Sequence, residues 1–174
     1  MKNKEITEYA MSLALKYGCQ DVKVVLLQNN EDAIDLRNGQ MERMHHALAR
    51  SLVMNLFLDG RDGFFYTNKV EKDGLDNFIR QAVETTRMLE PDESYTLADP
   101  SLYYKGDGPE LCNFDATLSQ MDPQEKLALA METDRQLVGS HPSIISAETR
   151  YSDRQYQGWY LISNGFQGYE ECSR

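Results

Sequence analysis

Two adjacent histidines are the most distinctive candidates for chemistry in this chain, which has three histidines in 174 residues. His45 and His46 lie in the stretch QMERMHHALAR, residues 40–50. Neighbouring side chains point to opposite faces of a strand and diverge by about 100° on a helix, so the pair does not easily chelate one ion. Either histidine alone could be a ligand, but Glu42 and Asp59 give no recognisable spacing for a second one. We therefore expect both histidines to be structural.

The cysteines and glycines offer no clearer site. Cys19, Cys112 and Cys172 are widely spaced and form no C-x-x-C pair, which indicates free thiols in a reducing compartment. A small hydrolase that pairs a cysteine with one of the histidines is an alternative that the spacing does not support. The stretch DGRDG, residues 59–63, lacks the glycine spacing of a phosphate-binding loop and predicts a turn.

Three tyrosines lie in a proline-rich stretch and allow two interpretations. Tyr95, Tyr103 and Tyr104 could form a peptide-binding surface, because aromatic rings offer contact area at low entropic cost. Alternatively they hold a long connection against the core, which is the interpretation we favour.

The charge of the chain excludes some classes of partner. It has 28 acidic and 18 basic side chains, a net charge of −10, which repels phosphate backbones and anionic lipid. No apolar run approaches the roughly 20 residues that span a bilayer. We expect a soluble, cytoplasmic protein with no direct nucleic-acid or membrane contact.

The first half of the chain predicts helices packed on an antiparallel sheet. Apolar residues from Ile6 to Tyr17 recur at helical spacing, and Gly18 suits a left-handed helix end. Residues 21–30, 32–39, 52–58 and 64–67 predict a meander of about four strands, with a tight turn at Asn38-Gly39. A second apolar helical pattern covers residues 75–83 and can lie on one side of that sheet.

The second half predicts a long irregular connection over residues 90–121 and then a third helix. Asp122 and Glu125 are suited to cap this helix, and Leu127, Met131 and Val138 are predicted to face inward. The last segment alternates like strands, with turns predicted at residues 152–153 and 164–165. The prediction is an α+β fold with an antiparallel sheet of about four or more strands. Its N-terminal domain covers residues 1–140, and residues 141–174 begin a β-rich central domain.

The order of these elements resembles the N-terminal domain of the TldD/PmbA family, known as modulators of DNA gyrase. The resemblance covers nearly the whole chain and is carried by several stretches: ALKYGCQDVKVVL, DLRNGQMERM, LVMNLFLDGRDGFFYTNKV, FIRQAVETTR, DPSLYYKGDGPELCNFDATLSQMDPQEKLALAME and YLISNGFQGYE. The stretches LYYKGDGPEL and YLISNGFQGY are more similar to the PmbA branch, also called TldE.

The resemblance implies a zinc metallopeptidase system that degrades unfolded peptides. In the TldD-type subunit a His-Glu-x-x-x-His helix in a later part of the chain binds zinc, whereas the PmbA-type subunit lacks this helix and partners TldD. No His-Glu dipeptide occurs here, so the resemblance assigns no catalytic, metal-binding or cofactor-binding residue to this chain. It implies that any zinc is bound by chain beyond Arg174.

The sequence thus supports two hypotheses about function. The first is a non-catalytic N-terminal segment that acts in assembly and in the access of peptides to a zinc site elsewhere, as a homodimer or as a heterodimer with a sister subunit. The second is a stand-alone acidic module that binds peptides or proteins without enzymatic activity.

Overall fold

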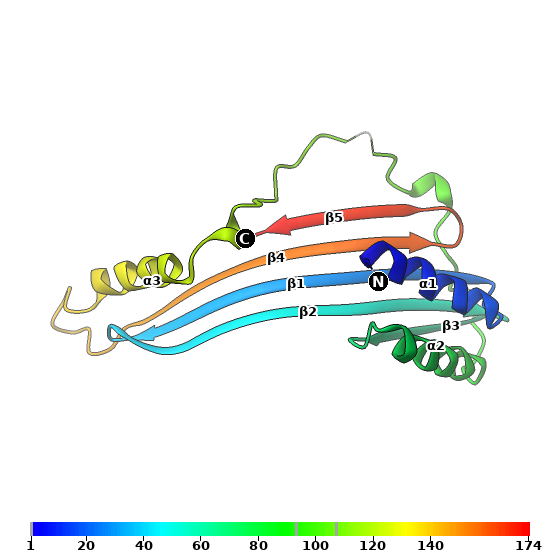
Figure 1. Cartoon of the computed structure of the whole chain (residues 1–174), viewed down its shortest axis with the longest axis horizontal. Coiled ribbons are helices and arrows are strands. Elements are labelled where there is room, and N and C mark those ends of the chain that lie inside the picture. The colour runs from blue at the N-terminus through cyan, green and yellow to red at the C-terminus, as the bar shows by residue number, and fades with distance from the viewer. Residues whose placement is uncertain (1, 93, 107) are drawn as a thin grey trace. The chain divides into compact units, whose positions relative to one another are not determined.

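The computed structural model describes residues 2–92, 94–106 and 108–174. Within these residues the chain forms one five-stranded sheet in the order β3-β2-β1-β4-β5, together with three α-helices (Figure 1). This architecture confirms the predicted α+β class. None of the helices in the described ranges has the length and apolar character of a membrane span. Glu93 and Asp107, which belong to the predicted connection, lie outside the described residues.

The elements follow each other in the order α1, β1, β2, β3, α2, two short 3₁₀ helices, α3, β4 and β5. The α-helices are α1 (Asn3–Lys16), α2 (Lys72–Arg87) and α3 (Pro123–Leu137), and the 3₁₀ helices cover Pro100–Leu102 and Leu118–Gln120. The strands are β1 (Asp21–Arg37), β2 (Gln40–Leu58), β3 (Arg61–Thr67), β4 (Glu148–Ile162) and β5 (Gln167–Ser173).

The described chain divides into two compact units that interleave along the sequence. The first unit comprises the chain up to Gln28, Ala49–Leu111 and Gln157–Glu170, and the second comprises Asn29–Leu48, Cys112–Tyr156 and Glu171–Arg174. The division of the sequence at residue 140 stays a prediction.

The first unit has an apolar core between its helices and its strands. Alternate residues of β1 and β2 are buried, as expected for strands with one covered face. Helices α1 and α2 contact each other and supply the other side of the core. The main members are Ile6, Ala10, Leu13, Val22, Val24, Leu26, Leu52, Met54, Leu56, Leu58, Leu75, Ile79 and Val83.

Two predicted turns are confirmed, because their residues adopt conformations that few side chains tolerate. Asn38 and Gly39 have φ angles of 49° and 78° and join β1 to β2, the combination required by a tight hairpin. Gly165, with φ of 106°, lies in the turn between β4 and β5.

Three other strand predictions are wrong in their boundaries. Residues 21–37 form one strand rather than two, and the predicted turn at Ser152-Asp153 lies inside β4. The turn predicted over DGRDG occupies only Asp59-Gly60, since β3 begins at Arg61. In each case polar residues that favour turns locally are kept extended by pairing with neighbouring strands.

In the second unit α3 packs on β1 and β4. The predicted cap is confirmed: the Asp122 carboxylate accepts a hydrogen bond from the backbone N–H of Gln124 at 2.7 Å, and Glu125 completes a capping box. The predicted inward position of Val138 is wrong, because this residue ends the helix and is 42% exposed. Leu127 and Met131 are partly buried, and the deepest residues of the helix are Lys126, Ala130 and Asp134.

Gly63 in β3 is required by the close approach of α2. A Cβ atom at this position would collide with the Thr86 hydroxyl and lie 2.5 Å from the Phe65 ring. Thr86 is buried and its hydroxyl donates to the Ala82 carbonyl, so it cannot easily move. We expect Gly63→Ala to lower the free energy of unfolding by about 1–3 kcal/mol.

Urea denaturation followed by circular dichroism measures this change. Gly74→Ala in α2 is the matched control, because its Cβ would meet only ordinary contacts at 3.5 Å or more. That substitution should stabilise the protein by up to about 1 kcal/mol through helix propensity. Equal effects of the two substitutions would contradict the packing argument.

Candidate functional site

The adjacent histidines lie in β2, as the pattern allowed, and both side chains are exposed. His46 Nδ1 lies 2.6 Å from Asp32 Oδ1 on β1. The structure thus places one of the two histidines in a polar cluster of the second unit. His45 is not part of that cluster.

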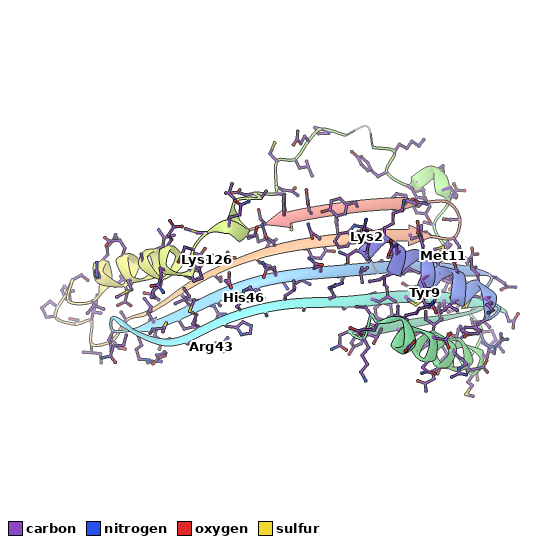
Figure 2. The ribbon with its side chains drawn as sticks, in the orientation of Figure 1. Lys2, Tyr9, Met11, Arg43, His46 and Lys126 are labelled. Carbon is purple, nitrogen blue, oxygen red and sulfur yellow. The ribbon has the colours of Figure 1, made fainter. Side chains whose placement is uncertain are left out.

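The cluster is centred on Lys126 of α3, which sequence reasoning did not single out. We define the Lys126 cluster as Asp32, His46, Lys126, Tyr151 and Asp153 (Figure 2 labels Lys126 and His46). The Lys126 ammonium lies 2.5 Å from Asp32 Oδ2 and 2.7 Å from Asp153 Oδ2, and its side chain is only 4% exposed. The Tyr151 hydroxyl donates to Asp153 Oδ2 at 2.7 Å. Helix α3 is therefore held to β1 and β4 by a buried ammonium between two carboxylates.

The ionisation of the cluster follows from these contacts. Burial alone would lower the pKa of Lys126, but hydrogen bonds to Asp153 and Asp32 outweigh it and raise the pKa. Burial likewise would raise the pKa of Asp32, and the hydrogen bonds from Lys126 and His46 outweigh it and lower the pKa. Lys126 therefore stays charged and hydrogen-bonded, which leaves it unsuited to act as a base or nucleophile.

Tyr151 is equally unsuited to proton transfer near neutral pH. Burial, followed by the hydrogen bond to Asp153, raises the pKa of its hydroxyl to about 12. A general acid or base works best with a pKa near the working pH. The Lys126 cluster therefore holds α3 against the sheet, and its lysine and tyrosine are not suited to acid–base catalysis near neutral pH.

A second polar contact lies further along α3. Asp134 is buried, and its Oδ1 accepts a hydrogen bond from the Thr149 hydroxyl of β4 at 3.0 Å. Together with Lys126 it lies on the helix face that contacts the sheet. No apolar periodicity marks these two positions, which is why the sequence pattern missed them.

The three cysteines occupy separate environments and are all free thiols. Cys19 is buried, and burial raises the pKa of its thiol to about 11. A thiol with a raised pKa is a poor nucleophile at neutral pH. Cys112 is exposed and Cys172 is half-buried.

The three tyrosines of the connection also lie in different environments. The Tyr103 ring lies 4.9 Å from the Phe166 ring, and its hydroxyl donates to the Ala98 carbonyl. Tyr95 and Tyr104 are exposed. Only Tyr103 therefore holds the connection in the way that we favoured.

An open hollow of about 270 Å³ lies between α1 and the strands β4 and β5 in the first unit. Its aromatic wall is the tilted pair of Trp159 and Tyr169, with ring centroids 5.3 Å apart. Lys4 and Glu8 of α1 lie on another side and form an exposed ion pair of 3.8 Å. The hollow thus offers aromatic contact area beside a lysine and a glutamate.

The described residues do not fit a zinc site. They contain no group of three or more His, Cys, Asp or Glu side chains placed to hold a metal ion. Asp32, the carboxylate that contacts His46, already accepts a hydrogen bond from the Lys126 ammonium. We derive no hydrolytic step through a metal from these residues.

Two models of one protein family match most of the chain. The family model described as PmbA/TldA metallopeptidase domain 1 matches residues 22–86, and that of the PmbA/TldA metallopeptidase central domain matches residues 116–174. A search of the curated proteins gives no significant match.

Solved structures match the whole fold. A protein from Bacteroides thetaiotaomicron, described as a modulator of DNA gyrase, is 36% identical with a TM-score of 0.94, and the match covers 99% of this chain and 39% of that one. A protein of the same description from Thermotoga maritima is 15% identical with a TM-score of 0.71, covering 98% and 37%. TldE from Thermococcus kodakarensis is 16% identical with a TM-score of 0.69, covering 97% and 37%. The chain thus spans about two fifths of the length of these relatives.

Removing the central ammonium tests whether the Lys126 cluster holds α3. We expect Lys126→Met to lower the free energy of unfolding by about 3–5 kcal/mol, because it removes the ammonium that compensates the charge of two carboxylates in a mostly buried position. Denaturation with urea measures the loss. The control Lys4→Met removes a lysine from an exposed pair and should cost less than about 1 kcal/mol. Similar losses in both variants would show that the cluster contributes little.

The raised pKa values of Lys126 and Tyr151 predict a loss of stability at alkaline pH. The unfolded chain releases the tyrosine proton near the ordinary pKa of 10.0, whereas the folded protein retains it to about 12. The stabilising contribution is therefore complete below pH 10 and is lost as the pH rises toward 12. Lys126, with its pKa above 10.5, acts in the same direction.

Urea denaturation at a series of pH values measures this loss. Tyr151→Phe should flatten the decline above pH 10, whereas Tyr66→Phe at an exposed position should not. Both are compared in a Cys19→Ala background, since the pKa of Cys19 is raised from 9.0 to about 11 and adds its own decline. An unchanged decline in Tyr151→Phe would exclude Tyr151 as its source.

Proposed function

This chain belongs to the PmbA/TldD metallopeptidase family, and we propose that it serves that system as a non-catalytic segment. Its proposed role is in assembly and in the access of unfolded peptides to a zinc peptidase site located elsewhere. We propose further that it works in the cytoplasm, as a homodimer or paired with a sister subunit, without direct contact to nucleic acid or membrane.

The observation that carries this proposal is the extent of the match to the Bacteroides relative. Nearly the whole chain aligns, yet it accounts for 39% of that relative's length. The matched part contains the first and central domains of the family description. A longer protein of this family therefore has ample chain in which to place a peptidase site.

The chemistry of the described residues also supports a non-catalytic role for this segment. Lys126 and both of its carboxylates are committed to holding α3, and Tyr151 keeps its proton far above neutral pH. The groups with the most perturbed environments thus act in packing, whereas catalytic groups are usually perturbed within a cleft.

The proposal is tested by assaying the purified 174-residue chain against a fluorogenic unfolded peptide, with and without added zinc. We expect no cleavage above the buffer rate in either condition. The full-length protein, mixed with its sister subunit, is the positive arm and should cleave the peptide in a reaction that a chelator abolishes. Zinc-dependent cleavage by the isolated chain would overturn the proposal.

A further inference from the structure

One edge of the sheet is unpaired over part of its length. Strand β3 pairs with β2 only from Leu52 to Leu58. The sheet order places β1 on the other side of β2, so within the described parts of the chain no strand neighbours the residues of β2 before Leu52 on the β3 side (Figure 1). We define the open edge as Gln40–Leu48, the part of this stretch that belongs to the second unit.

The backbone of the open edge has unused hydrogen-bonding capacity. Along an edge strand, alternate N–H and C=O groups point away from the sheet. Beyond the strand ladder, no described residue forms a backbone hydrogen bond with Gln40–Leu48. Natural proteins usually protect such edges with charged side chains, proline or a bulge. The sequence QMERMHHAL has no proline, lysine or glycine, and its two charged residues, Glu42 and Arg43, form ion pairs with Arg37 and Asp35 of β1. The edge is thus open to another strand.

Three large apolar side chains are exposed along the open edge, between polar and charged ones. Met41, Met44 and Leu48 are 54%, 50% and 60% exposed. Methionine is unbranched and flexible, so it adapts to partners of varied shape. A partner strand would therefore form both backbone hydrogen bonds and apolar contacts, and neither requires one particular sequence in the partner.

The charged side chains of the edge are paired within the unit. Glu42 accepts from Arg37 at 2.6 Å, Arg43 lies 3.5 Å from Asp35, and His46 contacts Asp32. The edge consequently has little charge left to attract a charged partner. A second copy of this chain, with a net charge of −10, would meet general repulsion that nothing on the edge offsets.

We propose that the open edge is a docking site for an extended, uncharged stretch of unfolded polypeptide, which adds to β2 as a further strand. Main-chain hydrogen bonds supply affinity in this mode of recognition, and the side chains supply modest selectivity. The proposal rests on the proposed function, since a site of this kind holds peptides for a peptidase. The proposal assigns the bound peptide a contact on β2, separate from any residue that cleaves the peptide.

Fluorescence anisotropy tests the site on the 174-residue chain, with no enzymatic readout. The probe is a short fluorescein-labelled peptide of alternating valine and threonine, with one lysine and one glutamate to keep it soluble and neutral. A second probe has the same side chains but N-methyl groups on all of its backbone amides. Because this removes the donors along both edges of the peptide, we expect binding of the second probe to weaken at least about tenfold.

Lysine substitution provides the matched comparison on the protein. Met44→Lys places a charge on the open edge and should weaken binding about tenfold or more. Met88→Lys changes a methionine that is 84% exposed, at the C-cap of α2 in the first unit, and should leave affinity within about twofold. Leu48→Lys serves as a second edge variant, and circular dichroism verifies that each variant is folded.

Other outcomes count against the docking site or against the proposed function. Equal binding of the two probes, equal binding by Met44→Lys and Met88→Lys, or no binding at all would overturn it. Sedimentation that shows self-association abolished by Met44→Lys, without peptide binding, would assign the edge to a second copy instead. Peptide binding by the edge together with a full-length protein that cleaves nothing would leave the site standing and reject the proposed function.

Discussion

Covering one face of an antiparallel sheet is the constraint on which the rest of this structure depends. Strands that alternate buried and exposed residues are stable only when helices or another layer exclude water from one side. In the first unit α1 and α2 do so with aliphatic side chains, so that burial of apolar area stabilises the unit. In the second unit α3 covers the strands with a small apolar cluster and a buried ammonium.

The ionic contact in the second unit contributes little net stability but determines the position of α3 on the sheet. A buried ion pair gains little net free energy, because the charges lose their hydration when they meet. Its hydrogen bonds are directional, however, and Lys126 reaches Asp32 on β1 and Asp153 on β4 at the same time. Sliding α3 along the sheet would leave these carboxylates unpaired, so the cluster determines where the helix lies as well as whether it binds.

The distribution of polar groups supports the proposed role of this part of the molecule in recognition. Lys126 and Tyr151, whose pKa values are raised, are committed to internal contacts, whereas no described residue outside the strand ladder forms a hydrogen bond with the backbone of the open edge. Backbone groups recognise extended chains with little regard to sequence. That property fits a member of a metallopeptidase family, whose substrates are polypeptides.

The sequence by itself determined the class of the fold, the tight turn at Asn38-Gly39 and the cap at Asp122, since each depends on residues adjacent in the chain. From the geometry of strands and helices, the sequence also predicts that the adjacent histidines do not jointly chelate an ion. Only the tertiary structure decided that residues 21–37 form one strand, because pairing with β2 and β4 overrides local turn preference. It alone brought Lys126 to Asp32, 94 residues away along the chain, because a charged residue buried by its partners leaves no apolar periodicity to read.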